Sequence, residues 1–108
     1  MVDQTLLAHC RLILIDTARN NRKIAYSKLA SLLGVANQSV GKYLNEIYKD
    51  EIAKGHPDLT LVAVYSGTEY GNYNSRGARP QSFKIDPKNE SHVRDYDTEL
   101  RRVYAHPW

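Results

Sequence analysis

The strongest constraint on the fold of this chain is the segment 26–44, which reads YSKLASLLGVANQSVGKYL. Apolar residues recur there at spacings of three and four, as they do on helices that bury one face. Before Gly34 these residues are Leu29, Ala30 and Leu33, and after it they are Val40, Tyr43, Leu44 and Ile47. Gly34 can adopt the left-handed backbone conformation that ends many helices. The segment therefore predicts two short helices joined by a turn, which is a helix-turn-helix.

The ends of these two helices are predicted from their polar residues. Ser27 is expected to cap a helix that begins at Lys28, because a serine hydroxyl can accept a hydrogen bond from a first-turn amide. Asn37 is expected to cap the second helix, which then continues to about Lys54. Gly41 has no side chain, so it predicts a close approach between the two helices. The helix-turn-helix would span about residues 27–54.

The remaining segments predict the elements of a winged helix. An amphipathic helix is expected over 4–19, with apolar residues at 6, 7, 10, 13 and 14, followed by a short strand at 24–26. Residues 59–65 and 81–85 read as two antiparallel strands, and the long Gly-rich connection 66–80 would be the wing. A last helix over about 91–104 would be capped by Ser91 and bury Val93, Tyr96, Leu100 and Val103. The expected fold is therefore a single α+β winged-helix domain over residues 1–108, with a small antiparallel sheet.

Composition limits the classes of function. A chain of 108 residues with 42% hydrophobic content suits one core with little room for a buried cofactor cavity. Its one cysteine, Cys10, lies among apolar residues and is expected in the core. The first residues do not resemble a signal peptide, and the wholly apolar run 12–15 is too short to cross a bilayer. We expect a cytoplasmic protein with no cofactor and no membrane contact.

No set of residues predicts a metal site or catalysis. The four histidines are His9, His56, His92 and His106, and none is paired with Cys, Asp or Glu at metal-ligand spacing. The Gly-rich connection lacks the Lys-Ser/Thr ending of a phosphate-binding loop. We therefore expect neither a metal ion nor an enzymatic activity.

The distribution of charge favours a nucleic acid partner. The net charge is +3, and positive charge concentrates in residues 1–35 and 66–85. On the second helix, the residues away from the apolar face are Gln38, Ser39, Lys42, Asn45, Glu46 and Lys49. Gln and Asn side chains can read adenine, and Lys can reach guanine or phosphate. The carboxylates of Glu46, Asp50 and Glu51 on the same helix oppose this interpretation, because they repel phosphate.

The helix-turn-helix resembles the DNA-binding part of the O6-alkylguanine-DNA alkyltransferases and the alkyltransferase-like proteins. Their pattern is a Tyr followed by Leu-Ala, a Gly and then Arg-x-Val-Gly, and it is met here by Tyr26, Leu29-Ala30, Gly34 and Gln38-Ser39-Val40-Gly41. Gln38 stands in place of the arginine with which that family displaces a base. Where the family carries Pro-Cys-His-Arg, this chain has Ala63-Val64-Tyr65-Ser66. The resemblance therefore implies DNA binding without alkyl-acceptor chemistry.

A second resemblance concerns the segment that follows the helix-turn-helix. The stretch 62–71, VAVYSGTEYG, is similar to small uncharacterised bacterial and phage proteins with the same order of helix, strand and Gly-rich turn. That resemblance implies no activity.

Two functions follow from these observations. The first is binding of duplex DNA without catalysis, and its expected contact residues are Tyr26, Ser27, Asn37, Gln38, Ser39, Lys42, Asn45, Arg76 and Arg79. Arg76 and Arg79 lie on the wing, where arginines can enter a minor groove or contact the backbone. The alternative is a protein-interaction or inhibitor module of phage or mobile-element origin, because eight tyrosines are also typical of protein interfaces.

Overall fold

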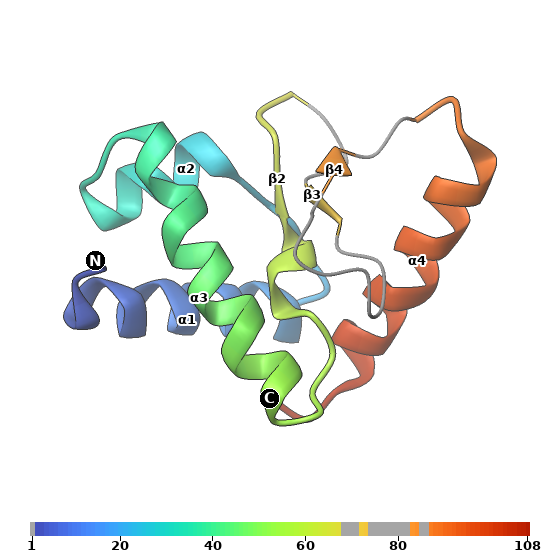
Figure 1. Cartoon of the computed structure of the whole chain (residues 1–108), viewed down its shortest axis with the longest axis horizontal. Helices are drawn as coiled ribbons and strands as arrows, with labels where there is room; N and C mark the ends of the chain where they lie inside the picture. The colour runs from blue at the N-terminus through green and yellow to red at the C-terminus, as the bar shows by residue number, and fades with distance from the viewer. Residues whose placement is uncertain (1, 68–71, 74–82, 85–86) are drawn as a thin grey trace.

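The computed structural model describes residues 2–67, 72–73, 83–84 and 87–108 (Figure 1). Four α-helices, two 3-10 helices and four two-residue strands make up the described part, so the fold is mixed α+β. In chain order they are α1 (Gln4–Arg19), β1 (Ile24–Ala25), α2 (Tyr26–Leu33), η1 (Asn37–Ser39), α3 (Val40–Ala53), η2 (Leu59–Val62), β2 (Ala63–Val64), β3 (Asn72–Tyr73), β4 (Phe83–Lys84) and α4 (Glu90–Ala105).

Helix α1 confirms the predicted helix over 4–19. Asp3 caps it, because its Oδ1 accepts hydrogen bonds from the amides of Thr5 at 2.9 Å and Leu6 at 3.1 Å. Its buried side chains repeat at spacings of three and four: Leu7, Cys10, Leu14 and Ala18. One face of α1 therefore lies against the core, as the periodicity predicted.

Helices α2 and α3 occupy the two helical segments predicted on either side of Gly34, and the prediction for Gly34 itself is confirmed. Gly34 ends α2 with φ of 71°, a left-handed conformation. The predicted caps are wrong. Helix α2 begins at Tyr26, after an extended Ala25, and Asn37 opens the 3-10 turn η1, after an extended Ala36. A side-chain cap needs extended backbone at its own residue, and here the two alanines have that conformation.

The prediction for Gly41 is also wrong. Gly41 lies in the first turn of α3 and is exposed. Apart from its chain neighbours and the backbone of its own helix, a Cβ added to it would meet no atom of the described residues within 4 Å. Gly41 therefore does not bring α2 and α3 together.

The predicted pairing of 59–65 with 81–85 is wrong for the described residues. Strand β2 pairs in parallel with β1, with Ile24 opposite Ala63 and Ala25 opposite Val64. Strand β4 pairs with β3 in antiparallel register. The first part of the predicted strand is instead the 3-10 helix η2, which Asp58 caps by accepting a hydrogen bond from the Thr60 amide at 3.0 Å.

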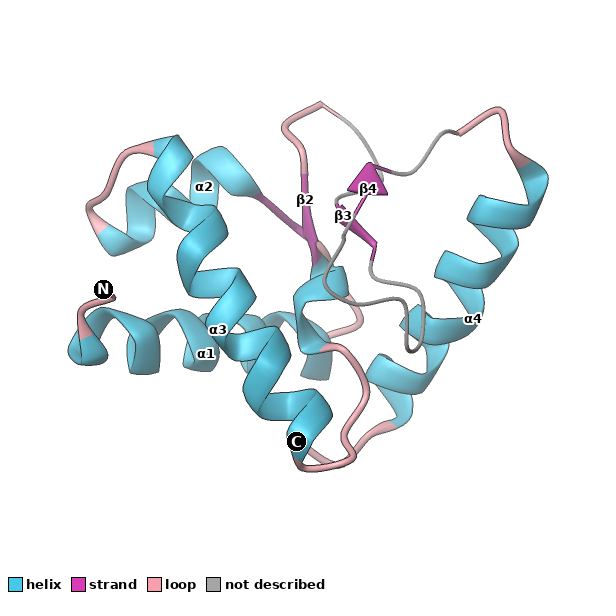
Figure 2. Ribbon diagram, in the orientation of Figure 1, coloured by secondary structure: helices cyan, strands magenta, loops and turns pink. Residues whose placement is uncertain are grey.

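Helix η2 lies at the centre of the fold and contacts α1, α3 and α4 (Figure 2). Leu59, Leu61 and Val62 have at most 1% of their surface exposed. The Tyr96 hydroxyl of α4 donates a hydrogen bond of 2.6 Å to the Leu61 carbonyl. This segment therefore joins α4 to the other helices.

Helix α4 extends the predicted helix over 91–104 by one residue at each end. Its cap is Asn89 and not Ser91, because the Asn89 Oδ1 accepts hydrogen bonds from the amides of Ser91 at 3.1 Å and His92 at 3.2 Å. As predicted, Tyr96, Leu100 and Val103 are buried, and Val93 packs against the core with part of its surface exposed.

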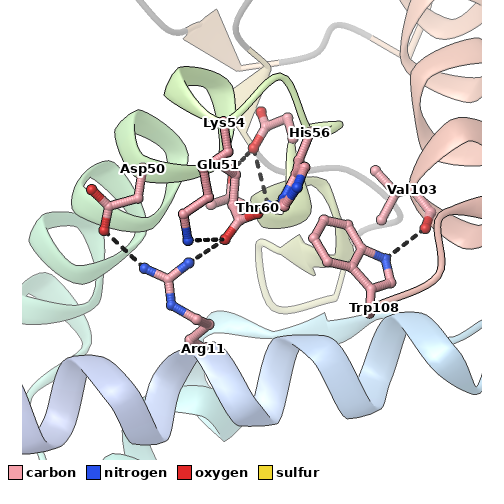
Figure 3. A network of polar contacts seen from close by, with 9 residues as sticks. Arg11, Asp50, Glu51, Lys54, His56, Thr60, Val103 and Trp108 are labelled. Atoms are coloured by element: carbon pink, nitrogen blue, oxygen red, sulfur yellow. Dashed lines mark hydrogen bonds and ion pairs between the residues drawn. The ribbon is translucent and has the colours of Figure 1, made fainter.

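Residues 106–108 return from α4 to the end of α3. The rings of His56 and His106 are 4.6 Å apart, and those of His106 and Trp108 are 4.3 Å apart. The Trp108 indole donates a hydrogen bond of 2.7 Å to the Val103 carbonyl (Figure 3). These contacts hold the last residues of α4 close to the loop that follows α3.

One buried carboxylate links α1 to α3. Glu51 is 3% exposed and is paired with the guanidinium of Arg11 (Figure 3). Its Oε2 is also 2.6 Å from Nδ1 of His56, and Arg11 contacts Asp50 at 2.8 Å. A buried charge is costly unless it is paired. Moving α3 away from α1 would separate Glu51 from Arg11, so the ion pair favours the observed position of the two helices.

We predict that Arg11→Met lowers the free energy of unfolding by about 2 kcal/mol, since the buried Glu51 carboxylate loses its guanidinium and keeps only His56 and Lys54 as partners. The double variant Arg11→Met/Glu51→Leu should recover most of this loss, because it removes both charges. Urea denaturation measures both values. Arg19→Met, an exposed change on the same helix, is the control, and equal losses in Arg11→Met and Arg19→Met would contradict the prediction.

Candidate nucleic-acid interface

The exposed face of α3 and η1 carries most of the predicted contact residues. Helix α3 buries Val40, Tyr43, Leu44, Ile47, Tyr48 and Glu51. On the other side of the helix Gln38, Lys42, Asn45 and Lys49 are exposed, at spacings of three and four. Asn37 is exposed and Ser39 is half-buried at the start of this face. The structure thus brings five of the predicted residues, together with Lys49, onto one helical surface.

The acidic residues of α3 are all paired with basic side chains. Glu46 contacts Lys49 at 3.7 Å, Asp50 contacts Arg11 at 2.8 Å, and Glu51 is buried against Arg11. They therefore oppose an anionic partner much less than the sequence suggested. Within residues 37–45 Lys42 is the one charged side chain, so the first half of the face has a net charge of +1.

Tyr26 and Ser27 lie in a second group of residues, at the start of α2. The ring of Tyr26, which is half-buried, is 4.8 Å from the ring of Tyr65, and the Ser27 hydroxyl is 2.6 Å from the Ser66 hydroxyl. The parallel register of β1 and β2 continues into both pairs, because each partner is 39 positions further along the chain. These contacts join the helix-turn-helix to the segment after β2.

Sequence reasoning missed the roles of Tyr65, Ser66 and Arg11. The signal for the first two was present: the dipeptide Tyr-Ser follows both short strands, at 26–27 and at 65–66. No local signal marked Arg11, because its partners lie 39 and 40 positions away. The predicted contacts Arg76 and Arg79, with most of the wing over 66–80, lie outside the described residues.

The position that resembles the alkyl-acceptor cysteine is apolar. Val64 is 5% exposed in β2. The cysteine of this chain, Cys10, is fully buried in α1, and burial raises the pKa of its thiol to about 11, although the neighbouring Arg11 acts in the opposite direction. The thiolate is the nucleophilic form, so Cys10 is a poor nucleophile near neutral pH.

Comparisons with known proteins do not indicate a function for this chain. Scans of protein-family models, curated proteins and solved structures find no match to this chain. In the described part of the chain, no helix has the length and apolar character needed to cross a bilayer.

The raised pKa of Cys10 predicts how stability depends on pH. The folded protein holds the thiol proton more tightly than the unfolded chain, in which the pKa is near the ordinary 9.0. This contribution to the free energy of unfolding is complete below pH 9 and is lost as the pH rises toward about 11. Denaturation at a series of pH values should show a steeper fall over this range for the native chain than for Cys10→Ala. Identical slopes would contradict the burial of the thiol.

Proposed function

We propose that this chain is a winged-helix protein that binds duplex DNA without altering it chemically. The observation that carries the proposal is the exposed face of η1 and α3, where Gln38, Lys42 and Asn45 follow one another at helical spacing. The neutralised acids of the same helix also support it. The helix-turn-helix arrangement of α2 and α3 suits insertion of the second helix into a major groove.

Each residue of the face has a specific role in the proposed complex. Gln38 and Asn45 present amides that can pair with adenine through two hydrogen bonds. Lys42 supplies positive charge for a phosphate or a guanine.

Gly41 supports the proposal as well. A glycine in the interior of a helix costs about 0.5–1 kcal/mol relative to alanine, and in the first turn, where Gly41 lies, the cost is smaller but of the same sign. No described residue lies close enough to Gly41 to require this, and its position between Gln38 and Lys42 is exposed. In the proposed complex the backbone at Gly41 approaches the DNA, where a side chain would interfere.

The wing is the second part of the proposed interface. Arg76 and Arg79 lie outside the described residues, so their contribution is inferred from the sequence. In the proposal they contact the DNA backbone or the minor groove beside the site of α3. Strands β3 and β4 pair as an antiparallel ladder on either side of this segment.

We predict that Lys42→Ala weakens binding to any duplex and lowers the slope of log affinity against log salt by roughly one unit, because one phosphate contact is lost. Fluorescence anisotropy with a labelled duplex over a range of salt concentrations measures both quantities. Arg101→Ala, an exposed change on α4, is the matched control and should leave both unchanged. An unaltered salt slope in Lys42→Ala would count against the proposed surface.

Gly41→Ala is predicted to separate stability from binding. The free energy of unfolding should rise by up to about 1 kcal/mol, because alanine is the better helix former. DNA affinity should fall, and it should fall further in Gly41→Leu. Ala53→Leu, at the exposed far end of α3, provides the control for added bulk. If Gly41→Leu binds DNA as tightly as the native chain, the backbone at Gly41 does not approach the duplex.

A further inference from the structure

We propose that a groove between α1 and α2 binds an acidic amphipathic helix of a protein partner. The groove has a volume of about 570 Å³ and is lined by side chains from α1, the turn after it, β1 and α2. No residue of α3 lines it. It is therefore separate from the exposed face of η1 and α3.

The groove has an apolar centre that the fold leaves uncovered. Leu12 of α1 is 65% exposed and Leu32 of α2 is 44% exposed, while Ile13 and Ile24 are partly buried beside them. Exposed apolar side chains that lie together on two elements are typical of protein-binding surfaces. A helix that places leucine-sized side chains at positions i, i+3 or i+4, and i+7 would cover such a groove.

The side chains along the groove are mainly basic, and this determines which polar residues a partner helix should carry. Arg22, Lys23 and Lys28 line it, and Asp16 is the one carboxylate among the lining residues. The described part of the structure gives no ion pair to Arg22 or Lys28, and both are exposed. Lys23 lies 5.4 Å from the ring centroid of Tyr96, so it is partly engaged already. The excess of positive charge fits Glu and Asp on either side of the partner's apolar stripe.

The combination of features favours a peptide over a nucleic acid. Duplex DNA presents phosphates and would gain nothing from the two leucines, whose burial is the main favourable term available at this surface. A second copy of this chain would need an acidic helix with an exposed apolar stripe. On the exposed side of α3, Ile52 lies near Asp50, but Asp50 is already paired with Arg11. Helix α3 of a second copy therefore does not meet this requirement.

The probe for the test is a labelled amphipathic peptide of about 16 residues, with leucines at helical spacing and glutamates at the polar positions. Its comparison peptide has the same leucines with lysines in place of the glutamates. Fluorescence anisotropy with the full chain should show about tenfold tighter binding of the acidic peptide, because opposite charges line the groove. Leu12→Asp and Leu32→Asp should each weaken this binding about fivefold or more, and Lys28→Glu should reduce the preference for the acidic peptide.

Matched controls distinguish peptide binding in the groove from non-specific binding elsewhere on the surface. Ile52→Asp changes an apolar side chain that is 45% exposed on α3, outside the groove, and Arg101→Glu reverses a charge on α4. Both should bind the acidic peptide like the native chain, and far-ultraviolet circular dichroism should confirm that every variant is folded.

Each of the following results would overturn the proposal: no binding of the acidic peptide, equal binding of the two peptides, equal losses in Leu12→Asp and Ile52→Asp, or weaker duplex DNA binding in Leu12→Asp. A concentration-dependent dimer that Leu12→Asp dissociates would also overturn it, by making a second copy the occupant. Sedimentation equilibrium measures that outcome.

Discussion

The arrangement of the helices depends on the burial of one short segment, Leu59–Val62, and the strand that follows it. This segment contacts α1, α3 and α4, and its apolar side chains are almost completely removed from water. Complete burial of a leucine or valine side chain is worth roughly 1.5–3 kcal/mol. Directly after it, Ala63 and Val64 pair with β1, which leads into α2. A single stretch of chain thus positions all four helices.

This central packing determines which side of α3 reaches solvent. The apolar face of α3 lies toward the core, and the Arg11–Glu51 pair fixes its C-terminal half to α1. The polar face is left exposed from Gln38 to Lys49, and its acids are paired with basic residues. The proposed DNA surface and the groove beside α1 and α2 are therefore two separate consequences of the same packing.

The helices could be predicted closely from the sequence, because each has an uninterrupted apolar period of three to four residues. Gly34 could be predicted because a left-handed helix end favours glycine strongly. The exposed residues of α3 followed in the same way, as the complement of its buried face.

The contacts between distant segments could not be predicted. Residues 59–62 are all buried, Thr60 included, and the alternation Leu59-Thr60-Leu61 suggested a strand with one exposed face where the chain forms a 3-10 helix packed against three helices. The start of α2 was misplaced because the pairing of β1 with β2 keeps Ala25 extended and lets the helix begin at Tyr26. Arg11 was missed because its carboxylate partners are distant in the sequence.

In the proposed complex, duplex DNA contacts the exposed face of η1 and the first half of α3. Amide chemical shifts of the ¹⁵N-labelled chain, recorded during titration with a short duplex at low salt, test it most directly. We expect the largest shift changes to cluster in residues 37–45 and the amide shifts of α4 to change little. Changes confined to α4 or to the groove between α1 and α2, or no changes at all, would contradict it.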